Sequence, residues 1–322
     1  MSQNIFRNST NCQNTTNSNN KNVWIDCTVA DDQYQLLAWL SPLDPGLRHC
    51  DIQERRVNNV GEWLMRSVEF QRWYGLGGER EGDKAVMFCY GNPGVGKTFI
   101  RYPVLFPREI NEQVLTSHHL SSLVVDRLCD WTRGQNTAVA CFYFDFAARK
   151  EQTAASVLGS LLKQMVSGTG RIPANIWRAL QEQKEAVNGR RPQLSDIVKM
   201  LQLITMSLQR TFVVIDALDE CTAAQRFKLF DSLQAILEKS PGARIFVTGR
   251  HHILSEIETR LAGLVASVSV GPTRDDIITF LRVRLSEDET PDAMDDSLET
   301  DILEKIPGNM SEMCVASMVL ET

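Results

Sequence analysis

The sequence predicts an α/β protein in which helices cover both faces of a mostly parallel, doubly wound sheet. Short apolar runs of strand length alternate with longer segments whose apolar residues recur at helical spacing. A glycine-rich stretch follows the first of these runs, residues 85–90, and an aspartate ends a later one, residues 211–216. Open α/β sheets bind ligands where their strands end, so both observations place polar groups at that edge.

Length and composition narrow the class of protein. The 322 residues suffice for one large domain or two modest ones, and 43% hydrophobic with 23% charged residues is near the globular average. The net charge of −6 disfavours a general nucleic-acid binder. No apolar run is long enough to span a membrane, and no signal peptide is evident. The eight cysteines include no C-x-x-C pair, which suits a reducing compartment and offers no zinc site. We therefore expect a cytoplasmic protein without nucleic-acid or membrane partners.

Two segments precede the first predicted strand. Residues 1–30 are rich in Asn, Ser and Thr, and we expect them to form a disordered polar tail. Residues 31–82 are expected to form a helical lead-in, because an apolar face at helical spacing begins near Gln33. The chain then turns at residues 41–46, and the next helix or loop-helix is expected from Asp51.

The stretch after the first strand fits the phosphate-loop pattern G-x-x-x-x-G-K-[S/T] at every fixed position. Its glycines let backbone N–H groups converge on phosphate oxygens. Lys97 would face the β- and γ-phosphates, and the Thr98 hydroxyl would be a Mg²⁺ ligand. A glycine-rich turn without a ligand is the alternative. The predicted nucleotide-binding residues are Gly91, Asn92, Pro93, Gly94, Val95, Gly96, Lys97 and Thr98.

The helix expected after Thr98 is interrupted. Pro103 and Pro107 each remove a helical donor, and a polar run follows them. Joining Ile100 directly to Ser121 would instead give one continuous apolar helix face. We therefore hypothesise that residues 101–120 are an insertion or a retained intron, with a surface loop after one helical turn as the alternative.

The middle of the chain continues the alternation of strand and helix. Residues 138–146 are expected to form a strand, and Asp145 near its end either faces the ligand edge or caps the next turn. Helices are expected at 154–166, from Pro173, and at 194–208, the last capped by Ser195 and Asp196.

Acidic residues end the strand at 211–216. Asp216 is placed to hold Mg²⁺ through water, and Asp219 or Glu220 could orient an attacking water. The alternative is a buried strand followed by a helix whose first turn carries acids.

The remaining elements complete the predicted sheet. A helix is expected at 224–237, a strand at 245–248, a mainly helical stretch at 253–264, a strand at 265–270 and a helix capped by residues 273–276 that runs to 285. Residues 286–322 are expected to be a linker and the start of a helical domain. The histidine doublets at 118–119 and 251–252 are interpreted as surface features rather than metal ligands.

Several of these motifs together resemble a known family. The sequence from Val213 to Glu220, with the small Ala217 and the second acid Asp219, resembles the extended Walker B motif of NACHT domains, the nucleotide switches of NOD-like receptors and related STAND ATPases. The strand ending in Arg250 resembles the next strand of that domain, which carries a basic sensor of the terminal phosphate. The segments 39–73 and 141–153 resemble the fungal members, and the resemblance covers roughly residues 30–310.

The resemblance implies a P-loop NTPase domain, a three-layer sandwich, at residues 83–285. It implies ATP or ADP with Mg²⁺, slow hydrolysis in which Asp219, Glu220 and Arg250 take part, and self-association through this domain. It also implies a helical domain, a winged helix and sensor repeats after residue 322, and the sequence itself contains no repeat that could be a sensor. Two other functions stay open: a nucleotide-binding remnant without turnover, and a small-molecule P-loop kinase.

Overall fold

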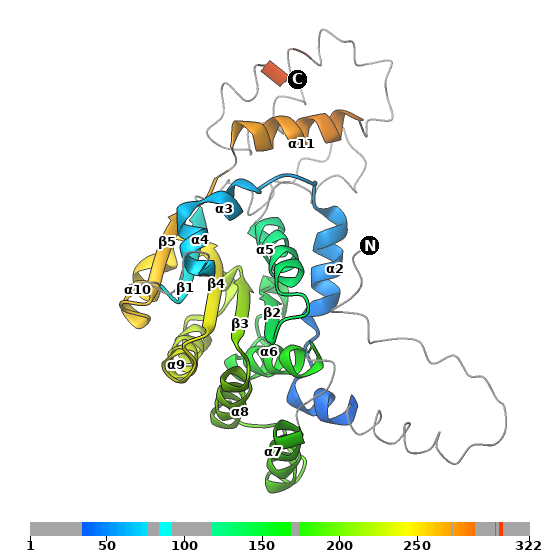
Figure 1. Ribbon diagram of the computed structural model, residues 1–322, viewed down its shortest axis with the longest axis vertical. Helices are drawn as coiled ribbons and strands as arrows, with labels where there is room; N and C mark the ends of the chain where they lie inside the picture. Colours follow the sequence, from blue (N-terminus) through cyan, green and yellow to red (C-terminus); the bar gives the residue numbers. More distant parts are fainter. Residues whose placement is uncertain are drawn as a thin grey trace, which may run out of the picture.

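A parallel sheet lies between two layers of helices in the computed structural model (Figure 1). The structure describes residues 34–75, 84–91, 117–168, 174–271 and 273–286, with residues 300, 303 and 304. The strands are β1 (Val86–Gly91), β2 (Thr137–Tyr143), β3 (Arg210–Asp216), β4 (Ala243–Arg250) and β5 (Val265–Ser269). Their order is β2-β3-β4-β1-β5, and every pair is parallel. The predicted doubly wound, mostly parallel α/β class is confirmed.

The strand order fixes where a ligand can bind. From β1 the chain passes to β2 at the far edge, returns through β3 and β4 to the side of β1, and crosses to β5. The connections after β1 and β4 therefore run in opposite directions, and such a reversal opens a crevice at the carboxyl ends of the strands. The register pairs Gly91, the last residue of β1, with Arg250, the last residue of β4.

One face of the sheet is covered by the lead-in helices and by the helix that follows β1. These are α2 (Pro45–Arg55), α3 (Trp63–Arg66), α4 (Val68–Tyr74) and α5 (Ser117–Trp131). Trp73 of α4 is 1% exposed, and its ring centroid lies 5.7 Å from that of Phe212 and 5.9 Å from that of Phe246. Trp73 is therefore a packing residue that fixes the lead-in against the sheet.

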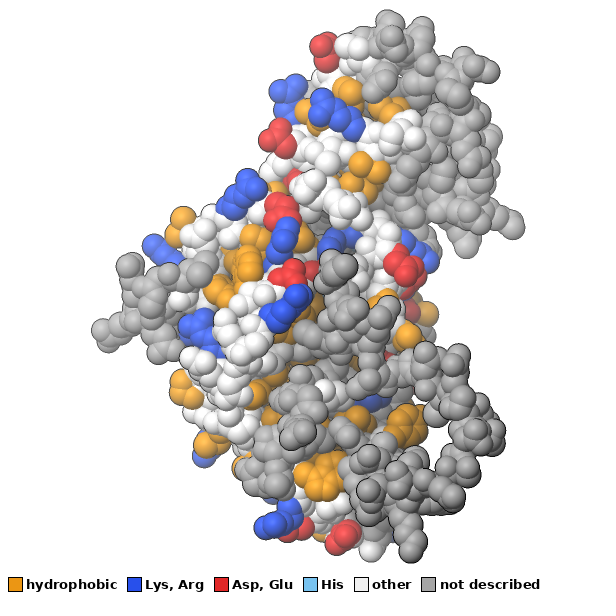
Figure 2. All heavy atoms as spheres, turned by 45° about the vertical axis from the view of Figure 1, so that its right-hand side comes forward, with side chains coloured by type: hydrophobic (Ala, Val, Ile, Leu, Met, Phe, Trp, Pro, Cys, Tyr) orange, Lys and Arg blue, Asp and Glu red, His pale blue; other side chains and the backbone are white. Residues whose placement is uncertain are grey.

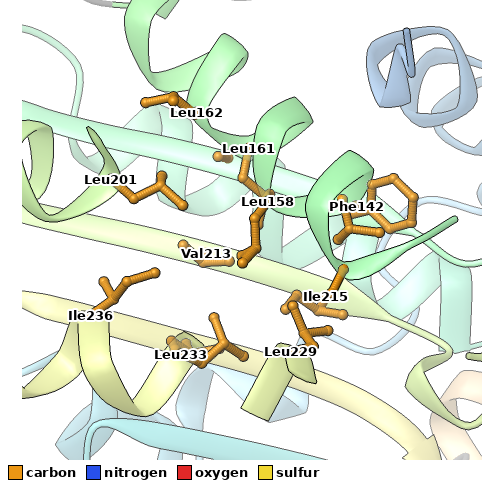
Figure 3. Packing of buried hydrophobic residues seen from close by; sticks show 14 of the residues in the cluster. Phe142, Leu158, Leu161, Leu162, Leu201, Val213, Ile215, Leu229, Leu233 and Ile236 are labelled. Carbon is orange, nitrogen blue, oxygen red and sulfur yellow. The ribbon is translucent and has the colours of Figure 1, made fainter. Parts of the chain in front are cut away.

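The opposite face is covered by α6 (Ala154–Gly168), α8 (Leu194–Ser207), α9 (Ala223–Lys239) and α10 (Leu254–Arg260), and α7 (Ala174–Ala186) packs on α8. Figure 3 shows side chains of α6, α8 and α9 converging on Val213 and Ile215 of β3. The residues that alternate with them along β3, Phe212 and Val214, belong to the core of the other face. Because β3 is buried on both sides, its sequence is continuously apolar rather than alternating.

A polar cluster around Asp126 holds α2 against α5. The Asp126 carboxylate lies 2.6 Å from Arg56 Nη2 and 3.1 Å from His49 Nε2. The other ring nitrogen of the buried His49 lies 2.7 Å from the hydroxyl of Tyr143 on β2. Burial raises the pKa of Asp126, but His49 and Arg56 outweigh it, so the pKa lies below its usual value. The lead-in is thus joined to α5 by charge and to β2 by a hydrogen bond, in addition to apolar packing.

A side chain covers part of the β2 edge. Gln164 of α6 accepts a hydrogen bond from the backbone N–H of Cys141 at 3.0 Å and donates one to the Cys141 carbonyl at 2.8 Å. The side-chain amide thereby makes the pair of hydrogen bonds that a neighbouring strand would make.

Several element boundaries differ from those predicted. α2 begins at Pro45, before the expected Asp51, because Asp44 caps the Gly46 N–H at 3.2 Å and proline fits the first helical turn. α8 is capped by Gln193, whose N–H donates to Asp196 Oδ2 at 3.2 Å, and not by Ser195. The predicted box before α11 (Arg274–Ser286) is confirmed, since Thr273 and Asp276 bond reciprocally at 3.0 and 3.1 Å.

The described part of the chain does not cover every predicted segment. The polar tail at 1–30, residues 92–116 and nearly all of 287–322 lie outside it. Residues 117–120 of the predicted insertion belong to the first turn of α5. In the described residues, no helix combines the length and apolarity needed to cross a membrane. On the face drawn in Figure 2, acidic and basic side chains are interspersed.

Candidate functional site

Asp216, the last residue of β3, is the centre of the site. Its carboxylate is 0% exposed and contacts two other elements. Oδ1 accepts hydrogen bonds from Ser121 Oγ of α5 and from Thr248 Oγ1 of β4, each at 2.6 Å. Oδ2 contacts Nδ1 of His118, also on α5. An acid at the carboxyl end of a central strand is thus held by the neighbouring strand and by the helix that follows β1.

The charge state of Asp216 follows from these contacts. Burial by itself raises the pKa of Asp216, but the interaction with His118 and the hydroxyls of Ser121 and Thr248 lower it below the usual value. Burial lowers the pKa of His118, yet the adjacent carboxylate raises it overall. The contact between His118 and Asp216 thus favours the charged form of each partner.

Thr248 fixes the turn that follows Asp216. Its hydroxyl donates to Asp216 and accepts the N–H of Ala217 at 3.0 Å. Ala217 has φ 52° and ψ 45°, a left-handed conformation that costs a residue with a Cβ about 1 kcal/mol. This turn directs the chain into the short helix η3 (Leu218–Glu220), so the acids after β3 face back toward the sheet edge.

Asp219 and Arg250 connect the ends of β3 and β4. The backbone N–H of Arg250 donates to Asp219 Oδ1 at 3.1 Å, and Arg250 Nε lies 3.2 Å from Asp219 Oδ2. The Asp219 side chain is 8% exposed, whereas that of Arg250 is 42% exposed. Asp219 thus positions the end of β4, and the Arg250 side chain extends toward solvent at the sheet edge.

The pKa of Glu220, which ends η3, is raised above its usual value. Partial burial raises its pKa, the nearby Asp219 and Asp216 raise it further, and His118 acts in the opposite direction. A carboxylate with a raised pKa is a better proton acceptor than an ordinary one. Glu220, one of the two acids predicted to orient a water, therefore has electrostatics suited to that role.

The structure brings part of the predicted site together. Gly91, Asp216, Asp219, Glu220 and Arg250 all lie at the carboxyl edge of the sheet, at or just after a strand end. The predicted nucleotide-binding residues Asn92, Pro93, Gly94, Val95, Gly96, Lys97 and Thr98 lie outside the described residues.

Three residues that contact Asp216 were not predicted. Ser121 and Thr248 carry no motif of their own. The interpretation of the first histidine doublet as a surface feature was wrong: His118 contacts Asp216, and His119 is buried, because the first turn of α5 lies over the sheet edge. The doublet at 251–252 is exposed, as expected. Asp145 caps η2 (Phe146–Ala148) by accepting the Ala147 N–H at 2.8 Å, which is the second of its two predicted roles.

A family described as Nephrocystin 3, N-terminal, matches residues 118–250, a range that begins at His118 and ends at Arg250. All the contacts of Asp216 and Asp219 described above fall within this range. No curated protein sequence matches significantly.

Several solved structures have a similar arrangement of helices and strands. One is the ORC1 protein of Aeropyrum pernix in complex with DNA, with 16% identity, a TM-score of 0.44 and coverage of 80% of this chain and 58% of that one. Another is a Walker-type ATPase of Pyrococcus abyssi, with 15% identity, a TM-score of 0.42 and coverage of 76% and 64%. This chain thus spans less than two thirds of the length of either structure.

Proposed function

We propose that this protein is an ATP-binding switch of the NACHT or STAND type, with slow Mg²⁺-dependent hydrolysis. The observation that carries the proposal is the position of Asp216, a buried and ionised carboxylate at the end of β3. It lies at the same sheet edge at which β1 ends in Gly91, the first residue of the phosphate-loop sequence. A P-loop NTPase needs this pair, a loop for the phosphates and a strand acid for the metal.

Each residue has a role in this proposal. Gly91, the loop amides and Lys97 bind the phosphates, while Thr98 and Asp216 hold Mg²⁺. The donor set at Asp216, a carboxylate with the hydroxyls of Ser121 and Thr248, is rich in oxygen, as Mg²⁺ requires. Bound Mg²⁺ would neutralise phosphate charge. Glu220 orients the attacking water, and Arg250, positioned by Asp219, senses the terminal phosphate.

The switch character belongs to the same proposal. ADP is bound at rest and ATP in an assembled state, with self-association through the NTPase domain. The setting we propose is a cytoplasmic, fungal response to non-self, in which further domains supply the sensor. A switch requires that a ligand bind one state more tightly than the other, so nucleotide affinity is the first quantity to measure.

The experiment is a titration of fluorescent ATP into the purified chain with Mg²⁺ present. We expect saturable binding at micromolar or lower concentration, and Lys97→Ala should abolish it. Lys84→Ala is the matched control, because Lys84 precedes the opposite end of β1, where its Nζ donates to the Gly263 carbonyl at 2.7 Å. Equal ATP affinity in the wild type and in Lys97→Ala would contradict the proposed site.

A nucleotide-binding remnant without turnover is the second candidate, and the contact of His118 with Asp216 favours it. Product analysis separates the candidates. Release of phosphate to water supports the switch ATPase, and binding without any product supports the remnant. Transfer of phosphate to an added acceptor would point to a kinase instead.

A further inference from the structure

Arg226, in the first turn of α9, uses all three nitrogens of its guanidinium group. Nε and Nη2 donate to the two carboxylate oxygens of Glu256 on α10, each at 2.7 Å, and Nη1 donates to the carbonyl of Cys221 at 2.8 Å. The arginine is 8% exposed, so these hydrogen bonds are largely shielded from water. Because the guanidinium group is planar and its donors form a rigid fork, this one side chain fixes the residue after η3 relative to α10.

Glu220 lies between two residues that are held from outside η3. Asp219, which precedes it, accepts the backbone N–H of Arg250 at 3.1 Å. Cys221, which follows it, is held through its carbonyl by Arg226. Both links lead to the same part of the chain, since α10 begins shortly after β4 ends. Glu220 thus belongs to a turn that is anchored on both sides, once at a strand end and once through a buried ion pair.

We propose that Arg226 is a positioning residue for Glu220: paired with Glu256, it holds the turn of η3 in the place from which Glu220 orients the attacking water. This inference rests on the proposed function and adds a residue to it. Among the residues that the structure describes, the hydrogen bonds of the Arg226 side chain go to Glu256 and Cys221 and to none of the proposed phosphate or metal ligands. Replacement of Arg226 should therefore slow turnover without changing ATP affinity.

The first test compares turnover with binding in the full chain. Arg226→Gln should slow single-turnover phosphate release about tenfold, the scale of a displaced catalytic group, and leave the Kd for fluorescent ATP unchanged. Arg226→Lys keeps the charge but not the planar fork, so it should lose part of the rate, and it replaces the glutamine variant if that variant does not fold. Asp231→Ala is the matched control, because Asp231 and Arg260 join the same two helices at the exposed surface, 3.3 Å apart.

A double variant separates positioning from a merely structural role. If Arg226 acts through Glu220, it has nothing left to position once the carboxylate is removed. Glu220→Gln combined with Arg226→Gln should then be no slower than Glu220→Gln alone. A structural role would instead slow the Glu220→Gln protein by the same factor as the wild type.

Hydrogen exchange follows the turn without nucleotide. The N–H of Glu220 donates to the Ala217 carbonyl at 2.9 Å, and the N–H of Cys221 donates to the Leu218 carbonyl at 3.1 Å. In Arg226→Gln, peptides that cover residues 217–222 should exchange several-fold faster, because the turn has lost its second anchor. Peptides of β3 should exchange as in the wild type, which also shows that the variant is folded. Asp231→Ala should change neither region.

The possible outcomes distinguish this inference from the proposed function. Unchanged exchange over residues 217–222 in a folded Arg226→Gln, or equal slowing of turnover with and without Glu220, would overturn the inference and leave the nucleotide site intact. A wild type that neither binds ATP nor releases phosphate would overturn the proposed function and the inference with it. Faster exchange at the turn, with slower turnover only where Glu220 is present, supports both.

Discussion

Arg250 and Asp219 form a two-point link between neighbouring strand ends. The arginine backbone N–H and its Nε both contact the same carboxylate, at 3.1 and 3.2 Å. Because the backbone N–H is one of the two donors, the carboxylate positions the end of β4 itself and not only a flexible side chain.

Asp219→Ala should therefore destabilise the protein by about 1 to 2 kcal/mol, since it removes a charged acceptor from a backbone donor. Urea unfolding monitored by circular dichroism measures this change. Asp231→Ala is the control: Asp231 pairs with Arg260 at 3.3 Å on the exposed surface and should contribute little. If the two variants lose the same stability, the link between β3 and β4 has no special role.

Thr248→Val tests the hydroxyl that bridges Asp216 and Ala217. The substitution keeps the shape of the side chain but removes one donor from the buried Asp216 carboxylate and leaves the Ala217 N–H without its partner. We expect a loss of about 2 kcal/mol in the free energy of unfolding. Thr211→Val on β3 is a matched control, because the Thr211 hydroxyl is buried and has no hydrogen-bond partner among the described residues. That variant should be neutral or more stable, and a similar loss in both would contradict the assignment.

The cluster around Asp126 predicts a dependence of stability on pH. The pKa of Asp126 is lowered in the folded protein, although burial opposes this, because His49 and Arg56 favour its ionised form. A depressed folded pKa adds stability at pH values above the ordinary aspartate pKa, and this stability is lost as the pH falls through the folded pKa. The stability gap between the wild type and Asp126→Asn should thus be largest near neutral pH and shrink on acidification. Urea unfolding between pH 7 and pH 3 measures the gap, and parallel profiles would contradict the prediction.

Glu220→Gln separates catalysis from binding in the proposed ATPase. The amide keeps the size of the side chain but removes the proton acceptor, so ATP affinity should be unchanged and turnover should fall about 100-fold. Single-turnover phosphate release measures the effect, with Glu238→Gln, on the exposed surface of α9, as the control. Unchanged turnover would assign the water-orienting role to another residue.

Most of the fold could be predicted because β1, β3 and β4 are buried on both faces. Each contains a short continuous apolar run and ends at a glycine or a charged residue. The position of the acids after β3 could be predicted as well, because parallel strands bring their carboxyl ends to one edge of the sheet. Helix starts were harder to predict: glutamine is an uncommon cap, and only the reciprocal bond with Asp196 identifies Gln193.

The partners of Asp216 could not be predicted from sequence. Thr248 reaches it across a strand pairing, and Ser121 and His118 reach it from a helix whose register depends on how the chain returns to the sheet after β1. No local pattern encodes such contacts. The doublet at 118–119 was misinterpreted because a pattern of two adjacent histidines says nothing about which structure covers them.

The amide of Gln164 has a consequence for how copies of this protein can meet. A sheet with an open outer strand invites another chain to extend it, which leads to uncontrolled polymerisation. In the middle of β2, the N–H and C=O of Cys141 are already engaged by Gln164. Extension of the sheet through β2 would have to displace that side chain, so a defined assembly of this domain is expected to leave the β2 edge closed.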